Sequence, residues 1–159
     1  PTRDGKFRFK PDWAARGKFH ARMPALPDHM TSLEEMDEQH PFRMVTAPAR
    51  SYLNSTFTET PMSIKREQRP TALIHPDDCV ALGIVLGDRV EIGNARGSII
   101  VHAKPFDGVQ RGVIVIESIW PNSAFEGGFG VNSLIGADPG APNGGAVFHD
   151  SAVWVRRAG

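Results

Sequence analysis

Residues 75–97 read H-P-D-D-C-V-A-L-G-I-V-L-G-D-R-V-E-I-G-N-A-R-G, and this stretch says more about the fold than any other part of the chain. It predicts a short helix with His75 as the N-cap and a proline in the first turn. Gly83 suits the left-handed conformation that ends a helix. A Gly-Asp turn then leads into a strand at 89–92, and a tight hairpin reverses the chain into a second strand at 98–103.

Composition limits the fold class and the kinds of partner. A chain of 159 residues has the length of one domain, and its 16 Gly and 13 Pro favour a turn-rich, mainly-β or α+β domain over a helical bundle. Lys plus Arg equals Asp plus Glu at 18 each, so no bulk charge attracts nucleic acid or an anionic membrane. No apolar run approaches the ~20 residues that cross a bilayer. We therefore expect no nucleic-acid partner and no membrane insertion.

Residues that carry metal or redox chemistry are sparse. Cys79 is the only cysteine, which excludes an internal disulfide, an iron–sulfur cluster and a cysteine zinc site within this chain. The six histidines show no metal-ligand spacing. The adjacent residues His149-Asp150-Ser151 cannot adopt triad geometry on an extended strand. We predict neither a catalytic group nor a metal ligand in this chain.

The chain divides into an irregular first quarter and a strand-rich remainder. Residues 1–40 show no sustained period and cannot bury much apolar surface alone, so we predict a connector from a preceding domain. Because the chain starts at Pro1 without an initiator Met, we expect a fragment of a larger protein, with processing as the alternative origin of this end. Residues 41–159 are expected to form the folded domain, with one or two short helices. Its strands are predicted at 42–46, 71–74, 89–92, 98–103, 113–116 and 152–156.

A long segment rich in Gly, Asn and Pro, residues 121–145, precedes the last strand. Structureless segments of this length in a compact domain are usually functional or disordered. Asn132 and Asn143 offer donor and acceptor groups that suit a pterin or guanine edge, and Phe148 offers a face for a fused ring. The alternative is a surface loop anchored by Leu134 and Phe148. Composition alone leaves both interpretations open.

A second candidate segment follows the first strand, at residues 46–57, and reads T-A-P-A-R-S-Y-L-N-S-T-F. The small polar residues Asn54, Ser55 and Thr56, with their backbone N–H groups, would make a pyrophosphate cradle without a large charge. An Asx or Ser/Thr turn that caps a helix explains the same residues equally well.

The order of these features resembles the C-terminal dinucleotide-binding domain of the molybdopterin oxidoreductases, the dimethyl-sulfoxide-reductase superfamily. The similarity runs from about Pro41 to Arg156, and the helix, turn and hairpin of residues 75–103 carry much of it. Residues 5–9, G-K-F-R-F, are similar to the segment that enters this domain in the family, with Arg8 where Glu is usual. The resemblance implies a mainly-β fold with short helices, the six-stranded double-psi β-barrel of the aspartate-decarboxylase-like type.

The resemblance also implies site residues near the last strand. Asn132-Ser133-Leu134-Ile135 and the run 144–150 match the family in order and position. By this similarity Asn132 contacts a pterin, while Phe148 and His149 line its pocket. Ile135 stands where Thr is usual, which removes a hydroxyl contact. His149 stands where Lys or Tyr is common.

The first loop is similar to the branch of the family that carries Leu-Asn-Ser-Thr-Phe, and it lacks the Thr-Gly-Arg of many other members, such as the nitrate reductases. This match implies further cofactor-binding residues, namely Thr46, Ala47, Pro48, Tyr52, Asn54, Ser55 and Thr56.

The resemblance implies that the chain is a cofactor-binding domain at the C-terminal end of a larger Mo or W oxidoreductase. The domain would position pterin and pyrophosphate and would not be catalytic alone. The implied cofactor is molybdopterin guanine dinucleotide in its bis form, with the metal held by other domains. Those domains, with an iron–sulfur cluster among them, are the expected partners. The alternative is a freestanding double-psi barrel that binds protein or peptide. The sequence does not specify the compartment, cytoplasmic or periplasmic, or the substrate.

Overall fold

The computed structural model divides into two compact units, and each is treated by itself. The barrel unit comprises Glu34–Gly136 with His149–Gly159, and the second unit comprises Pro1–Leu33 with Ala137–Phe148. The residues that the structure describes are 4–10, 12–13, 17–18, 20, 23–26, 28, 34–117, 119–141 and 144–159.

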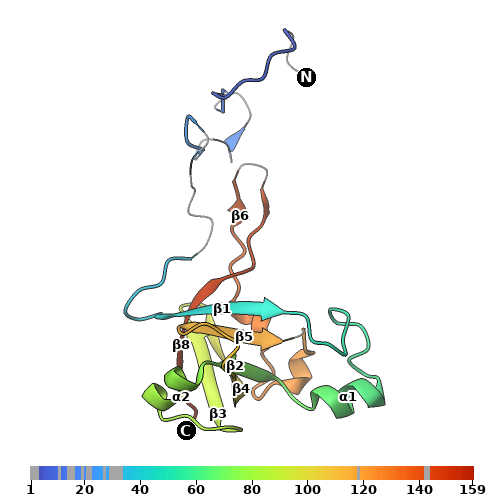
Figure 1. Cartoon of the computed structure of the whole chain (residues 1–159). Coiled ribbons are helices and arrows are strands. Elements are labelled where there is room, and N and C mark those ends of the chain that lie inside the picture. Colours follow the sequence, from blue (N-terminus) through green and yellow to red (C-terminus); the bar gives the residue numbers. More distant parts are fainter. Residues whose placement is uncertain are drawn as a thin grey trace. The chain divides into compact units, whose positions relative to one another are not determined.

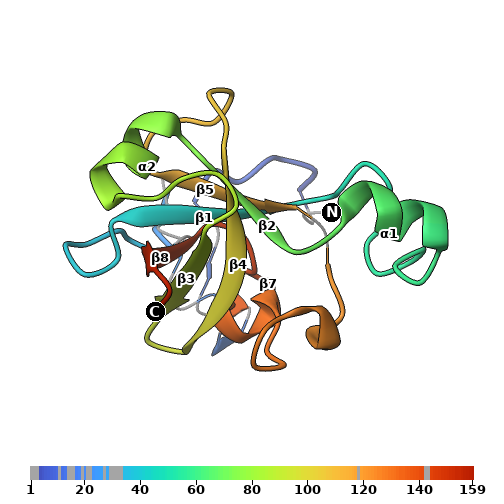
Figure 2. The same ribbon diagram turned by 90° about the horizontal axis from the view of Figure 1, so that it is seen from below.

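The barrel unit is a closed six-stranded sheet with the strand order β1-β5-β2-β4-β3-β8 (Figures 1 and 2). Two pairs, β1 with β5 and β2 with β4, are parallel, and the other neighbours are antiparallel. The expected mainly-β, six-stranded double-psi barrel is therefore confirmed. The strands are β1 (Phe42–Ala47), β2 (Thr71–Ile74), β3 (Arg89–Asn94), β4 (Gly97–Pro105), β5 (Val113–Glu117) and β8 (Ser151–Arg157).

Alternating apolar residues in the strands build the core. In β4 the buried positions are Ile99, Val101 and Ala103, every second residue, as a strand with one face toward a core requires. Val90 and Ile92 repeat this pattern in β3. Each fully buried Ile or Val contributes roughly 1.5–3 kcal/mol relative to exposure. The predicted strands agree with the observed ones to within a few residues at each end.

Two short helices flank the barrel at opposite ends, α1 (Pro61–Glu67) and α2 (Pro76–Leu82) (Figure 2). Helix α2 begins where the sequence predicts, with the Asp77 amide donating to Nδ1 of His75 at 3.1 Å. It ends at Gly83, which is left-handed with φ 65°. The sequence analysis did not predict α1, because its residues carry no apolar period and none of them is buried.

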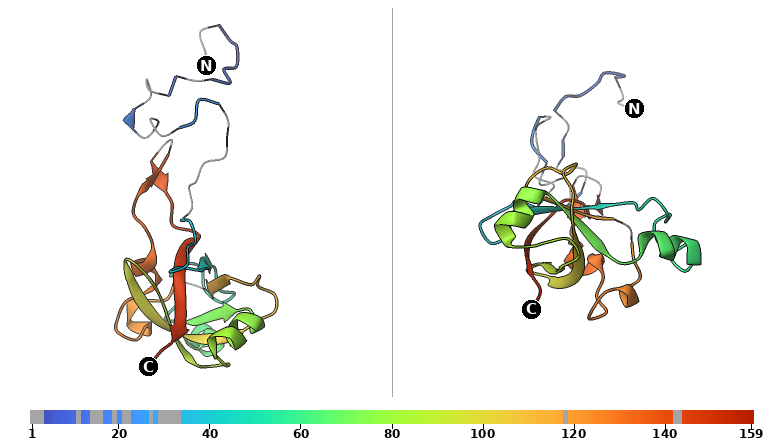
Figure 3. Two further views of the ribbon diagram at one scale, coloured as in Figure 1. Left: turned by 90° about the vertical axis from the view of Figure 1, so that its left-hand side faces the viewer. Right: turned by 60° about the horizontal axis from the view of Figure 1, so that its bottom comes forward.

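The Gly-rich segment before β8 has little regular structure, as predicted. In the barrel unit it forms two 3-10 helices, η3 (Asn122–Ala124) and η4 (Val131–Leu134). In the second unit, β6 (Pro139–Gly140) pairs antiparallel with β7 (Gly145–Ala146). β8 follows and runs alongside β3 to the C-terminus (Figure 3). Asn143 lies outside the described residues.

The N-terminal part of the chain differs from two further expectations from the sequence, a short strand within residues 2–9 and one helical turn at Leu33–Met36. The short strand expected within residues 2–9 is not formed in the part that the structure describes, 4–9. The helical turn expected at Leu33–Met36 is not formed at 34–36, and Leu33 lies outside the described residues. The indole of Trp13 donates to the Pro24 carbonyl at 2.9 Å. That residues 1–40 connect to a preceding enzyme domain stays a prediction. Across the described ranges, no helix has the length and apolar character to span a bilayer.

Candidate functional site

The two candidate binding segments meet at one edge of the barrel. Strands β1 and β8 are antiparallel, with Met44 opposite Ser151, so the same register brings Thr46 opposite His149. Oγ1 of Thr46 lies 3.5 Å from Nδ1 of His149. The parallel neighbour β5 ends at the same edge, where Glu117 is opposite Ala47. We call this meeting point of β1, β5 and β8 the site edge.

The first loop leaves the site edge and is tied down at Tyr52. The Tyr52 side chain is 6% exposed, and its ring contacts Trp120 edge-on with 5.0 Å between the centroids. The amide of Ser51 donates to the Glu67 carboxylate at 2.9 Å, which links the loop to the end of α1. Trp120 follows β5, so the loop is held between that strand's exit and α1. Pro48 is exposed at the start of the loop.

The tip of this loop is a tight turn that presents small polar groups. Leu53 and Thr56 exchange backbone hydrogen bonds of 3.1 and 2.8 Å, and Asn54 between them has a positive φ of 51°. Asn54, Ser55 and Thr56 are all exposed. Within the described residues, no hydrogen bond uses the amides of Asn54 and Ser55. This arrangement offers donors to an anion.

The helix-cap alternative is not found for these residues. The N-cap of α1 is Thr60, which makes no side-chain hydrogen bond to the helix. The hydroxyl of Thr58 donates backward, to the Ser55 carbonyl at 3.1 Å. A helix cap at α1 therefore does not explain the polar residues of this turn.

Asn132 lies on η4, which is held in place by buried side chains and by hydrogen bonds to its last carbonyl. Its neighbours Val131 and Leu134 are buried, at 4% and 0% exposure, whereas Asn132 itself is exposed. The Leu134 carbonyl accepts hydrogen bonds from Asn94 Nδ2 at 2.8 Å and from Arg96 Nε at 2.9 Å. Leu134 is thus an anchor, as the surface-loop alternative expected, and the segment it anchors presents Asn132.

Phe148 is placed differently from the other candidates. It belongs to the second unit and is 49% exposed, and its role as an anchor in the surface-loop alternative stays a prediction. The position of its ring relative to Asn132 stays a prediction.

One polar group near the site edge has no partner in the described part of the chain. The hydroxyl of Tyr52 is buried there without a hydrogen bond. Burial first, and then the Glu67 carboxylate, raise the pKa of Tyr52, so its phenol is neutral and a potential donor. An unsatisfied buried hydroxyl costs about 1–3 kcal/mol. Among the described residues no group of three or more His, Cys, Asp or Glu is arranged to hold a metal ion.

Sequence reasoning missed the residues that hold the site together. Trp120 carried a usable signal, because it is a large aromatic residue three positions after the buried strand β5, and large aromatic residues contribute much to a core. Glu34, Arg43 and Arg96 carried none, since each of them also bonds to a residue 38 to 118 positions away in the chain.

Comparison with known proteins gives a consistent result. Residues 42–152 match the family model described as "Molydopterin dinucleotide binding domain". The chain is 31% identical over 157 residues to the probable oxidoreductase YoaE of Bacillus subtilis, a match that covers 99% of this chain and 22% of that protein. It is 33% identical over 135 residues to the dimethyl sulfoxide/trimethylamine N-oxide reductase of Rhodobacter capsulatus, which covers 74% of this chain and 16% of that protein.

The fold also matches a solved structure. The acetylene hydratase from Pelobacter acetylenicus superposes with a TM-score of 0.64 at 17% identity, covering 76% of this chain and 19% of that chain. This likeness shows the fold. The chain spans about a fifth of YoaE, so its relatives are much longer proteins of which it matches one part.

Proposed function

Because this chain belongs to the family of molybdopterin dinucleotide-binding domains of the dimethyl-sulfoxide-reductase superfamily, we propose that it holds molybdopterin guanine dinucleotide, in the bis form, for a larger Mo or W oxidoreductase. The observation that carries this proposal is the site edge. There Thr46 and His149, from segments about a hundred residues apart in the chain, lie side by side.

The first loop suits the phosphates of such a cofactor. Residues 46–58 include no Asp or Glu, and their single charged residue is Arg50, so the charge within the loop itself attracts a pyrophosphate. The Glu67 carboxylate that touches the loop is engaged by the Ser51 amide. The exposed turn at Asn54 and Ser55 adds backbone and side-chain donors. Neutral donors of this kind bind phosphate oxygens without the cost of burying a further charge.

The second segment suits the pterin. Asn132 offers a carbonyl oxygen and an amide N–H₂ on one planar group, which matches the alternating donors and acceptors of a pterin edge. The buried neighbours Val131 and Leu134 restrain the backbone of η4, so little backbone entropy is lost on binding. Thr46, Ala47 and His149 would line the site edge between the two segments, while Phe148 is a candidate by the family resemblance alone.

The domain's part in the reaction is to position the cofactor. The bound cofactor, with its metal, supplies the redox chemistry. The chain's own residues bind the pyrophosphate, orient the pterin edge and exclude water at the site edge. Tyr52 fits this role, because its unpartnered hydroxyl would gain an acceptor if the loop closed on a ligand.

The partners proposed are the remaining domains of the same oxidoreductase. Helix α1 and the turn before it carry four large apolar side chains that are at least 43% exposed: Leu53, Phe57, Met62 and Ile64. We call this set the α1 face. Since the relatives extend far beyond the matched part, the occupant proposed for the α1 face is the remainder of the enzyme.

The test is cofactor retention in the full-length oxidoreductase. Asn132→Ala is expected to weaken cofactor binding by roughly 1–3 kcal/mol, because a buried pterin group would lose its partner. Pterin and metal content per purified protein are measured beside a melting curve. The matched control is Asn122→Ala, an exposed Asn on η3, which should retain full content.

Full cofactor content in Asn132→Ala would contradict the proposal that this segment holds the pterin. A collapsed melting curve without a specific loss of cofactor would place Asn132 among the structural residues, and would contradict the proposal as well.

A further inference from the structure

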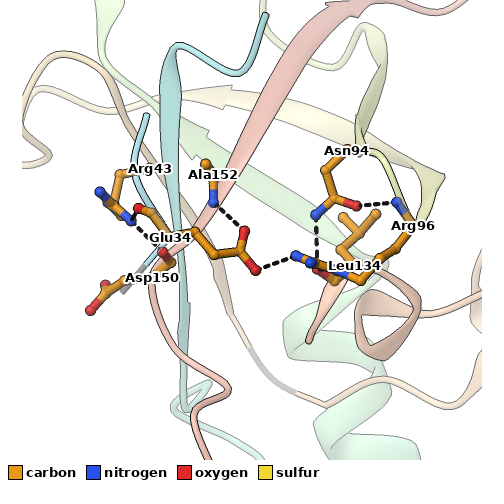
Figure 4. Close-up of polar contacts among 7 residues, drawn as sticks. All are labelled: Glu34, Arg43, Asn94, Arg96, Leu134, Asp150 and Ala152. Atoms are coloured by element: carbon orange, nitrogen blue, oxygen red, sulfur yellow. Dashed lines mark hydrogen bonds and ion pairs between the residues drawn. The ribbon is translucent and has the colours of Figure 1, made fainter. Parts of the chain in front are cut away.

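A single polar network joins Glu34, in the segment that leads into β1, to both parts of the proposed site. These parts are η4, which carries Asn132, and the residues before β8, which include His149. We call this polar network the Glu34 network, and Figure 4 shows its members. They are Glu34, Arg43, Asn94, Arg96, Leu134, Asp150 and Ala152.

The Glu34 carboxylate uses its two oxygens for different elements. Oε2 accepts a hydrogen bond from the Ala152 amide in β8 at 3.0 Å, and Oε1 pairs with Nη2 of Arg96 in the β3–β4 hairpin. Arg96 in turn donates from Nε to the Leu134 carbonyl at 2.9 Å. Through Arg96, the Glu34 carboxylate is therefore linked to η4, the helix that presents Asn132.

The backbone of Glu34 makes a second connection. Its carbonyl accepts from Nη1 of Arg43 in β1, and the same Nη1 donates to the Asp150 carbonyl (Figure 4). Asp150 has a positive φ of 60° and directly follows His149. Asp adopts this left-handed conformation more readily than most residues, and the Arg43 guanidinium holds its carbonyl in place. The backbone of Glu34 is thus tied to the residue next to His149.

The geometry of this network matters more than its strength. The side chains of Glu34 and Arg96 are 35% and 36% exposed, so their pair alone is worth little in water. The same two side chains, however, restrain β8, the hairpin and η4 at once. A network with several fixed partners sets orientation more effectively than an isolated surface pair.

We propose that Glu34 is a positioning residue for the cofactor site, acting through Arg96 on Asn132 and through Arg43 on His149. This inference rests on the proposed function. It means that the segment entering the barrel, and not the barrel alone, sets the relative positions of the two site segments. Seating of that segment and cofactor retention are then coupled.

The first experiment needs no cofactor. In this chain, hydrogen exchange is measured at the amides of Ser133 and Ile135, which donate to Gly130 and Asn132 within η4. Glu34→Ala is expected to speed exchange at these amides about tenfold, while β3 and β5 amides stay unchanged. The matched control is Glu35→Ala, an exposed neighbour for which exchange should stay as in the parent chain.

The second experiment measures pterin and metal retention in the full-length enzyme. Glu34→Ala is expected to lose about tenfold in retention, the scale seen when a residue that orients a binding group is removed. Glu34→Gln keeps an acceptor for the Ala152 amide but loses the charge that holds Arg96, so it should fall between Glu34→Ala and the parent. Glu35→Ala should match the parent.

The outcomes separate this inference from the proposed function. If Asn132→Ala loses cofactor but Glu34→Ala does not, the positioning role is wrong and the proposed function stands. If Glu34→Ala loosens η4 but neither variant loses cofactor, the proposed function is wrong, and the positioning role with it. A lower melting temperature with unchanged η4 exchange and unchanged retention would also overturn the inference.

Discussion

The two α-helices are both seven residues long and both begin with proline, yet they are held in different ways. Helix α2 has a side-chain cap from His75, a left-handed Gly83 at its end, and two buried residues, Asp78 and Cys79. Helix α1 has no side-chain cap, no buried residue, and Gln68 at its end with φ 64°.

The difference shows two sources of helix stability. An isolated helix of this length is marginal in water, so caps and tertiary burial decide whether it forms. Helix α2 has both within the chain. Helix α1 has neither, and its apolar side chains Met62 and Ile64 are exposed at 64% and 43%. We therefore expect α2 to be an integral part of the barrel unit and α1 to gain its stability from contacts outside it.

The largest effect is expected from Asp78→Ala in α2. Asp78 Oδ2 accepts from the Gly112 amide at 2.7 Å, and Arg111 lies 3.6 Å from Oδ1. Removing the carboxylate leaves a half-buried amide without a partner and should lower the free energy of unfolding by about 1–3 kcal/mol. Urea denaturation measures the change. Asp77→Ala, on the exposed side of the same helix, is the control and should change it by less than about 0.5 kcal/mol. Equal effects would show that α2 is not anchored through Asp78.

Substitutions at the C-terminal ends of the two helices should change the free energy of unfolding in opposite directions. A Cβ at Gly83 meets no atom within 4 Å, so Gly83→Ala tests backbone conformation alone and should destabilise by about 1 kcal/mol. Gln68→Gly removes a side chain from an unfavourable positive φ and should stabilise by up to about 1 kcal/mol. Gly97→Ala, without positive φ, is the control. Chemical denaturation that gives the same sign for both variants would contradict the comparison.

A smaller, pH-dependent effect on stability is expected at His102 in β4. This strand pairs with β2, which follows α1, and with β3, which follows α2. Burial first, and then Arg69 after α1, lower the pKa of His102. The unfolded chain therefore takes up a proton at a higher pH than the folded chain, so stability falls as the pH drops below about 6.5.

The measurement is a series of urea denaturations from pH 8 to pH 5. His102→Gln should flatten the decline in stability below about pH 6.5, because the substituted side chain does not titrate. His40→Gln is the control and should keep the decline. A decline that is unchanged in His102→Gln would show that other groups cause it.

The smallest effect on the chain itself is expected at the α1 face. Met62→Ser with Ile64→Ser removes side chains that are already exposed, so the free energy of unfolding should change by less than about 0.5 kcal/mol. In the full-length enzyme the same pair should weaken docking of this domain, seen as faster proteolysis between domains. Ser63→Ala, between them, is the control. Unchanged proteolysis in the double variant would remove the α1 face from the domain interface.

The strands and α2 could be predicted because their signals are local. Alternating apolar residues at Ile99, Val101 and Ala103 reveal a strand with one buried face, and a capping His with a terminal Gly reveals α2. The candidate residues Asn54 and Asn132 could also be named in advance, because their side-chain chemistry and their place in order along the chain are visible in the sequence.

The tertiary structure decided what those residues lie beside. The sequence by itself determined the six strands, the capped helix and the polar loops, since each depends on residues a few positions apart. Only the closed barrel brought Thr46 to His149 and linked Glu34 to Ala152 across 118 residues. Strand pairing between distant segments depends on the register of the whole barrel, and that register follows from burying all the apolar faces together. No local pattern records it.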